Sequence, residues 1–129
     1  MSYINGIPSK KYKILDLLEN TTTGKLFKAV KIISKNLVAI KKTKKFVNTP
    51  KEPGDTNFIN VRNEIAIIKK LSHPSIAKIY EVFYIREFYF IGSDYCKCGN
   101  LYDYYKFHLS EKQICIIIYQ ILSGVIYLH

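Results

Sequence analysis

The pattern of apolar and polar positions along residues 12–43 predicts three β-strands. The strands are expected at residues 12–18, 26–33 and 37–40, and clusters of turn-forming residues lie between them. The third strand is apolar throughout, whereas the first has only one apolar side. The segment is therefore expected to fold as an antiparallel meander.

Beyond residue 43 the pattern changes from strands to mixed structure. Residues 44–57 combine two of the four prolines with polar residues, which predicts a long surface loop. Apolar residues at helical spacing then predict a helix over residues 60–71. The remaining expected elements are strands at residues 76–83 and 88–93, a short helix at 101–107 and a final helix that Ser110 caps.

Five strands with one inserted helix define an α+β fold. We expect an N-terminal tail over residues 1–11, a sheet domain over residues 12–95 and a helical part over residues 96–129.

The final helix is apolar nearly all round its second half, so it needs cover on every side. Nothing after His129 supplies that cover, so the sequence is expected to be incomplete, and self-association through this helix stays open. The apolar run from Ile114 to Leu128 is shorter than the roughly 18 residues of a membrane span, and Gln120 interrupts it. We therefore predict a buried helix and no membrane partner.

Charge is unevenly distributed along the chain, whose net charge is +10. Residues 1–52 hold twelve lysines and three acidic residues, whereas residues 53–129 hold eight basic and seven acidic residues. A basic front half fits nucleic acid, an anionic membrane or a phosphate-bearing ligand, and the plainer interpretation is a solvated lysine surface. Three cysteines, an odd number, do not form a disulfide framework, so we expect a reducing, cytoplasmic setting.

Four sequence features carry candidate chemistry. Residues 38–41 read Val-Ala-Ile-Lys at the end of the third strand, and Glu64 lies on the helix that follows. Residues 71–76 read Leu-Ser-His-Pro-Ser-Ile, a joint that would end this helix, with His73 in a structural role. Residues 88–103 contain the fifth strand and a Gly-containing link. Each feature alone is common, but the four in this order at compatible spacing are specific.

On these residues the chain resembles eukaryotic Ser/Thr protein kinases over residues 12–129. The joint and the last helix are most similar to those of the calcium/calmodulin-dependent and calcium-dependent kinases. The resemblance implies a kinase N-terminal lobe followed by the first two helices of a truncated C-terminal lobe. It also implies that ATP is the cofactor and that a protein is the substrate of the complete enzyme.

The same resemblance assigns roles to individual residues. Lys41 would reach the α- and β-phosphates of ATP, and Glu64 would hold it there as an ion-pair partner. Their plainer interpretations are a surface lysine at a strand end and a solvated helix glutamate. Cys96 and Cys98 have no second ligand pair, so no metal site is predicted. The other nucleotide-binding positions that the family implies are Leu18, Gly24, Leu26, Ala39, Ser93, Asp94, Cys96 and Asn100.

Two parts of the kinase pattern are missing. In the phosphate loop only Gly24 of three glycines remains, and Glu19 and Thr21 replace the other two, so weaker or altered nucleotide binding is expected. The catalytic loop and the metal-binding motif would follow His129. We therefore assign no catalytic residue and no Mg²⁺ ligand, expect Mg²⁺ only in the complete enzyme, and predict that the 129-residue chain is inactive alone.

Two other functions stay open from the sequence. A pseudokinase-like interaction module with weak or no nucleotide binding is favoured by the lost glycines. A nucleic-acid-binding domain would suit the basic front half, but the ordered kinase motifs argue against it, and no nucleic-acid partner is expected.

Overall fold

The computed structural model describes residues 3–4, 6–21, 24–44 and 61–129. The loop predicted at residues 44–57 therefore lies almost entirely outside the described residues. The chain forms two compact units. The sheet unit comprises residues 1–70 and 79–95, and the helix unit comprises residues 71–78 and 96–129.

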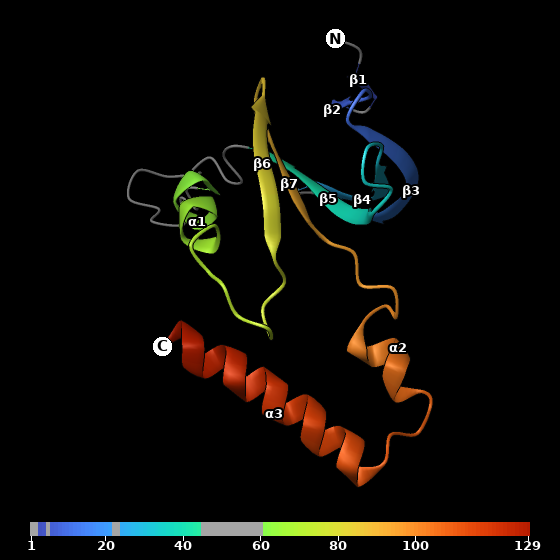
Figure 1. The fold of residues 1–129 in the computed structure, drawn as a ribbon, viewed down its shortest axis with the longest axis vertical. Coiled ribbons are helices and arrows are strands. Elements are labelled where there is room, and N and C mark those ends of the chain that lie inside the picture. Colours follow the sequence, from blue (N-terminus) through green and yellow to red (C-terminus); the bar gives the residue numbers. More distant parts are fainter. Residues whose placement is uncertain (1–2, 5, 22–23, 45–60) are drawn as a thin grey trace, which may run out of the picture. The chain divides into compact units, whose positions relative to one another are not determined.

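A five-stranded antiparallel sheet in the order β3-β4-β5-β7-β6 forms the sheet unit (Figure 1). Its members are β3 (Tyr12–Asn20), β4 (Gly24–Lys31), β5 (Leu37–Lys44), β6 (Ile79–Ile85) and β7 (Phe88–Asp94). The five predicted strands and the α+β class are confirmed, with shifted strand ends. Helix α1 (Val61–Ile68) lies within the predicted helix but is shorter, because it ends in a tighter turn in which the Lys70 N–H donates to the Ile67 carbonyl.

The core of the sheet unit lies on one face of the sheet. It consists of buried residues from β2 to β7, of which Ile7, Ile40 and Phe90 have 0 or 1 % of their surface exposed. Burial of each such side chain contributes about 1.5–3 kcal/mol. The other members are Tyr12, Phe27, Ala29 and Val38.

The segment before residue 12 joins this core. Within the N-terminal tail that the sequence predicts over residues 1–11, β1 (Tyr3–Ile4) pairs with β2 (Ile7–Pro8) in a small hairpin, and Ile7 is completely buried. Gly6 turns the chain there with φ +85°, and a Cβ at this position would lie 2.9 Å from Cζ of Phe90. The hairpin is therefore packed on the aromatic centre of the core.

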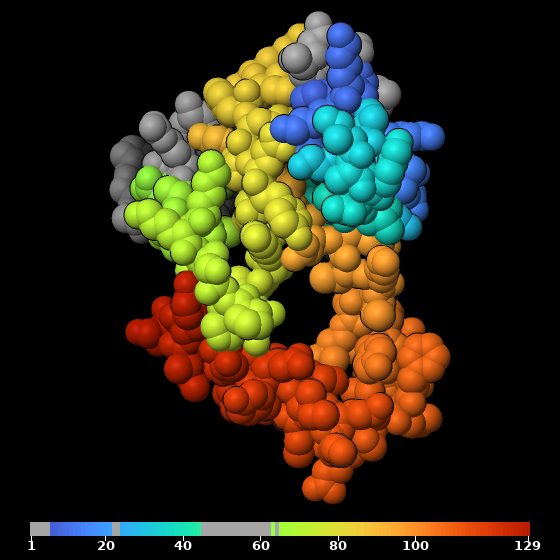
Figure 2. Space-filling model, viewed as in Figure 1, coloured from blue at the N-terminus to red at the C-terminus, as the bar shows by residue number. Residues whose placement is uncertain are grey.

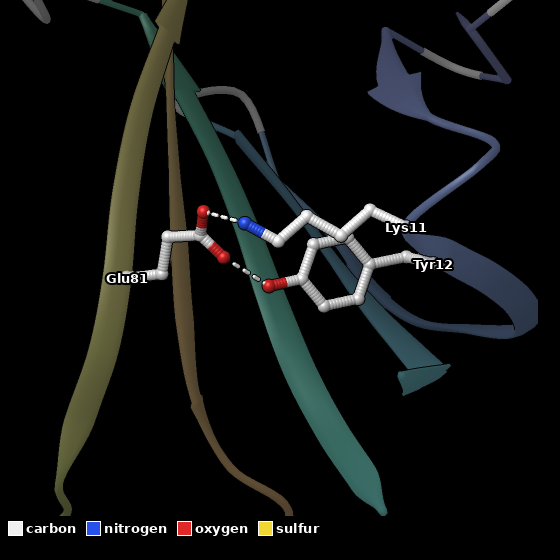
Figure 3. Close-up of polar contacts among 3 residues, drawn as sticks. All are labelled: Lys11, Tyr12 and Glu81. Atoms are coloured by element: carbon white, nitrogen blue, oxygen red, sulfur yellow. Dashed lines mark hydrogen bonds and ion pairs between the residues drawn. The ribbon is translucent and has the colours of Figure 1, made fainter. Parts of the chain in front are cut away.

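A polar bridge crosses the same face of the sheet from β3 to β6 (Figure 3). The carboxylate of Glu81 accepts a hydrogen bond from the Tyr12 hydroxyl through one oxygen and from the Lys11 ammonium through the other. Strand β7 lies beside β6 beneath this bridge, and its Gly92 lies next to the tyrosine hydroxyl with room for a small side chain. A Cβ on Gly92 would lie 3.9 Å from the Tyr12 hydroxyl oxygen.

Ionisation of the bridge follows from its surroundings. Burial, followed by the hydrogen bond to Glu81, raises the pKa of Tyr12 well above its ordinary value. Burial alone would raise the pKa of Glu81, but the hydrogen bonds from Lys11 and Tyr12 outweigh burial and lower it. The bridge therefore holds a charged carboxylate and a neutral phenol at neutral pH.

The helix unit is built on α2 (Leu101–Tyr105) and α3 (Glu111–Leu128). Ser110 caps α3 as predicted: its hydroxyl accepts the backbone N–H of Gln113, and the Gln113 side chain accepts the backbone N–H of Ser110. Residues 71–78 lie against the C-terminal half of α3, coloured red in Figure 2. Gly124 permits this contact, since a Cβ there would lie 3.4 Å from Ser75.

Most of α3 is exposed in the described chain, and Gly124 is its one buried residue. Its exposed apolar side chains include Ile118, Ile121, Leu122 and Ile126. By length and composition α3 could cross a membrane, a test that core helices of soluble proteins also pass. The buried helix that the sequence predicts would need further cover.

The polar bridge predicts a pH-dependent contribution to stability. Glu81→Gln should lower the free energy of unfolding at pH 7 by about 1 kcal/mol, the value of one hydrogen bond at a partly exposed ion pair. Because the pKa of Glu81 is lowered on folding, the contribution is complete above its ordinary value of 4.5 and is lost as pH falls through the folded-state pKa. Urea unfolding followed by circular dichroism at several pH values measures this difference.

Glu19→Gln is the matched control, because this substitution removes the same negative charge from an exposed position on β3. An equal loss of stability in both variants, or a loss in Glu81→Gln that does not shrink in acid, would contradict the assignment.

Candidate functional site

The residues of β5 alternate between the core and the opposite face of the sheet. Val38 and Ile40 are buried in the core, so Ala39 and Lys41 point to the other face. Ala39 is 8 % exposed and Lys41 is exposed. Lys41 therefore lies on the face of the sheet opposite the core.

Neighbouring strands add two more predicted site residues to this face. Ser93 of β7 lies directly opposite Ala39, and Leu26 of β4 lies directly opposite Lys41. Paired residues in antiparallel strands project to the same side. The register therefore brings together four predicted residues, and we call Leu26, Ala39, Lys41 and Ser93 the lysine face.

Glu64, the predicted partner of Lys41, lies in α1. Its side chain is outside the described part of the structure, so the ion pair between Lys41 and Glu64 stays a prediction. Ile65, the next residue, is 6 % exposed, so α1 is packed through this side chain.

The turn between β3 and β4 contains the remaining glycine of the predicted phosphate loop. The Thr21 backbone N–H donates to the Gly24 carbonyl at 2.9 Å, and the Gly24 N–H donates to the Thr21 hydroxyl at 3.2 Å. Residues 22–23, at the tip, are outside the described residues. The Gly24 N–H, a donor that a phosphate could use, therefore already has an acceptor within the turn.

Gly24 is also required by packing. A Cβ at this position would lie 2.2 Å from the backbone carbonyl oxygen of Lys42 on β5. Real contacts of this kind do not occur below 3.0 Å, so a side chain would force the strands apart. The family resemblance implies that Gly24 contacts the nucleotide, and the packing of β4 against β5 is a second reason for a glycine at this position.

The other two predicted residues of the sheet unit lie at strand ends. Leu18 lies in β3 where the pairing with β4 shifts register between Leu17 and Glu19, and it is 41 % exposed. Asp94 ends β7, and its carboxylate accepts a hydrogen bond from the Tyr80 hydroxyl. This hydrogen bond raises the pKa of Tyr80.

Two contacts near Asp94 were not predicted from the sequence. Tyr80 is exposed in β6, and no motif singles it out. The ammonium of Lys28 lies 4.9 Å from the centroid of the Tyr95 ring, a cation–π contact that also joins distant segments. Only the strand register, which places β6 and β4 near the end of β7, could have indicated either contact.

Cys96 and Asn100 belong to the helix unit. The Cys96 carbonyl accepts the Gly99 N–H at 3.3 Å, closing a turn. Asn100 caps α2 by accepting the Asp103 N–H at 2.8 Å. Both residues therefore have structural partners, and their predicted contacts with a nucleotide stay predictions.

His73 has the structural role expected of it. Its Nδ1 accepts the Ser75 backbone N–H at 3.0 Å, and its Nε2 lies 3.4 Å from the Ser123 hydroxyl. Since Nδ1 is an acceptor, the neutral ring carries its proton on Nε2 and cannot take the proton of Ser123. Ser123 and His73 therefore do not act as a catalytic nucleophile and its general base. The Ser72 N–H donates to the Tyr127 hydroxyl at 3.0 Å and fixes the joint to α3.

A hollow of about 400 Å³ opens beside this joint within the helix unit. Apolar groups dominate its lining, which includes His73, Leu122, Ile126 and Tyr127. Among the described residues, no three His, Cys, Asp or Glu side chains gather as a metal site requires.

These features match one family. A family model for the protein kinase domain matches residues 12–129, and the chain belongs to this family. Its sheet unit is the kinase N-terminal lobe, and its helix unit contains the start of the C-terminal lobe.

Individual relatives agree with this assignment. NUAK family SNF1-like kinase 1 of Homo sapiens is 35 % identical over 121 residues, which are 92 % of this chain and 18 % of the relative. Mitogen-activated protein kinase kinase kinase kinase 3 of Homo sapiens is 31 % identical over 124 residues, which are 95 % of this chain and 13 % of that protein. The chain thus spans less than a fifth of the length of these curated relatives.

A solved structure shows the same fold. The crystal structure of Rad53 1–466 in complex with AMP-PNP superposes with a TM-score of 0.74 at 22 % identity. The match covers 93 % of this chain and 30 % of that chain.

The packing of Gly24 gives a test of the turn. Gly24→Ala should lower the free energy of unfolding by about 1–3 kcal/mol, because the added Cβ overlaps the Lys42 carbonyl. Gly92→Ala is the control, since its nearest contact would be an ordinary 3.6 Å. The midpoints of urea unfolding of the Gly24→Ala and Gly92→Ala variants measure the difference. Equal midpoints would show that the Lys42 carbonyl of β5 does not lie as close to Gly24 of β4 as the structure indicates.

Proposed function

We propose that this chain is the ATP-binding portion of a Ser/Thr protein kinase. The observation that carries the proposal is the lysine face, where Lys41 projects beside Ala39 and opposite Leu26. Three hydrogen-bonded strands fix the backbone position of Lys41, and its ammonium supplies a positive point charge that suits the phosphates of a nucleotide. Family membership supports the same function, and the Rad53 structure contains an ATP analogue.

The site residues divide by the chemistry each would supply. Leu18, Leu26 and Ala39 would contact the apolar faces of adenine, and Lys41 would pair with the phosphates, held by Glu64. The backbones of Asp94 and Cys96 would pair with the adenine edge, and Asn100 would reach the ribose. Ser93, at the end of β7, would border the space behind the base.

Phosphoryl transfer needs groups that are not assigned in residues 1–129. No Asp of the chain matches the catalytic base or the metal-binding motif of the family. We therefore propose that the chain alone transfers no phosphate to a peptide and that Mg²⁺ is bound only in the complete enzyme, whose substrate is a protein. The joint at residues 71–76 and helix α3 support placement in the calcium-dependent group.

A second function is favoured by the turn before β4. The Gly24 N–H has the Thr21 hydroxyl as acceptor, and Glu19 adds negative charge near the expected phosphates. A pseudokinase-like interaction module with weak nucleotide binding would retain the fold without this donor. For the isolated chain, the exposed apolar residues of α3 also support self-association.

Lys41 tests nucleotide binding directly. Lys41→Ala should weaken ATP binding about tenfold or more, the value of one charge-assisted contact. Lys44→Ala is the matched control. It removes the same positive charge from the same strand, but on the face opposite Lys41. Calorimetric titration of ATP measures both. Equal weakening in the two variants would refute a specific role for Lys41, and undetectable binding by the parent chain would favour the interaction module.

Ser93 tests the position of the base. The small side chain should admit an ATP analogue with a benzyl group on the adenine amine, whereas Ser93→Met should exclude it and still bind ATP. Competition titrations measure the two affinities. Equal affinity of both proteins for the analogue would place the base away from Ser93.

A further inference from the structure

The turn between β4 and β5, residues 32–36, lies beside the start of β3 (Figure 1). The Ile32 N–H donates to the Lys11 carbonyl at 3.0 Å and joins the two segments. Within the turn, the Lys31 N–H donates to the Asn36 carbonyl at 2.9 Å, and the Lys35 N–H donates to the Lys31 carbonyl at 2.8 Å. Residues that are distant in sequence therefore share one end of the sheet.

Four lysines lie at this end of the sheet, on both of its faces, since Lys31 pairs with Tyr12 and Lys13 pairs with Val30. Lys10 and Lys13 flank the start of β3, and Lys31 and Lys35 flank the turn, which projects at the surface in cyan beside the blue N-terminal residues in Figure 2. Among the described residues these four lysines form no ion pair. Glu81, which Lys31 approaches closely enough to lower its pKa, is already engaged by Lys11 and Tyr12.

An apolar side chain stands at the tip of the same turn. Ile33 is 88 % exposed, the largest value among the exposed large apolar residues of the described chain. Lys35 adopts the left-handed backbone conformation, with φ +60°, which non-glycine residues adopt mainly in tight turns. An isolated exposed isoleucine needs no explanation, but Ile33 is at the tip of a turn that has lysines beside it on both faces of the sheet, so an apolar tip is combined with positive charge.

We propose that these five residues, the lysine–isoleucine patch, bind the surface of an anionic lipid bilayer. Lysines at such a surface each strengthen binding about fivefold through the negative headgroups. An apolar residue that projects beyond them can enter the boundary between headgroups and acyl chains. Nucleic acid or an acidic peptide would pair with the lysines but leave Ile33 in water.

The patch is independent of the lysine face. Ile33, Lys31 and Lys35 lie at the β4–β5 turn, and Lys10 and Lys13 lie at the start of β3, whereas Lys41 is in the middle of β5. The sequence predicted no membrane partner because the apolar run from Ile114 to Leu128 is too short for a membrane span. The lysines of the patch are spread over residues 10–35, and only the fold brings them to one end of the sheet. Membrane association would then concentrate the kinase lobe at a bilayer whether or not it binds ATP.

The chain contains no tryptophan, so Ile33→Trp introduces a single fluorescent reporter at the tip of the patch. With vesicles of phosphatidylcholine and phosphatidylserine, its emission should shift to the blue, and added salt should reverse the shift by screening. Vesicles of phosphatidylcholine alone should leave the emission unchanged. A shift with RNA or polyglutamate, combined with none on anionic vesicles, would overturn the proposal in favour of another polyanion.

Substitution of the lysines in the otherwise unchanged chain tests their contribution to membrane binding. Lys13→Ala with Lys35→Ala should weaken sedimentation with anionic vesicles about twentyfold, as expected for two surface lysines. Lys69→Ala with Lys70→Ala removes the same charge after α1 and should change binding little. Equal losses in both pairs would overturn the proposal, as would binding to neutral vesicles that neither pair affects, since α3 would then be the membrane-binding element.

Discussion

The strict alternation of β5 is the constraint on which both the core and the candidate site depend. Val38 and Ile40 must face the core, and this fixes Ala39 and Lys41 on the opposite face. A slip of one residue would exchange the two sets, burying a lysine ammonium among Phe27 and Phe90 at a cost of several kcal/mol. The buried apolar side chains therefore determine where the charge is, and β4 and β7 on either side of β5 determine which residues accompany it.

The sheet unit is also stabilised by contacts between residues that are far apart in the sequence. Tyr12 reaches from β3 to Glu81 on β6, over the glycine at position 92, and Ile7 seals the core from the N-terminal side (Figure 3). The hydrogen bond from Tyr12 to Glu81 joins segments 69 residues apart in the sequence. At the other end of the chain, Tyr127 and Gly124 fix the joint at residues 71–78 onto α3, so each unit has its own tertiary contacts.

Local patterns predicted most of this fold. The strands follow from alternation, and the start of α3 follows from Ser110, because both signals lie within a few residues. The burial of Ile7 could not be predicted, since a two-residue strand has no periodicity, and neither could the pairing of Tyr80 with Asp94 or Tyr12 with Glu81, which depends on register. Among the site residues, Ala39 and Lys41 were chosen from the Val-Ala-Ile-Lys motif, and their common face follows only from the register of β5 in the sheet. The packing role of Gly24 and the capping role of Asn100 likewise required three-dimensional contacts.

The central claim is that the lysine face, and not the general positive charge, binds ATP. Amide chemical shifts of the nitrogen-15-labelled chain during an ATP titration test it most directly. The account predicts saturable shifts at Leu26, Ala39, Lys41 and Ser93, with little change at Lys13, Lys31 and Lys35. Shifts confined to those three lysines, or lost on adding salt, would contradict the account, because ATP would then bind only as a polyanion.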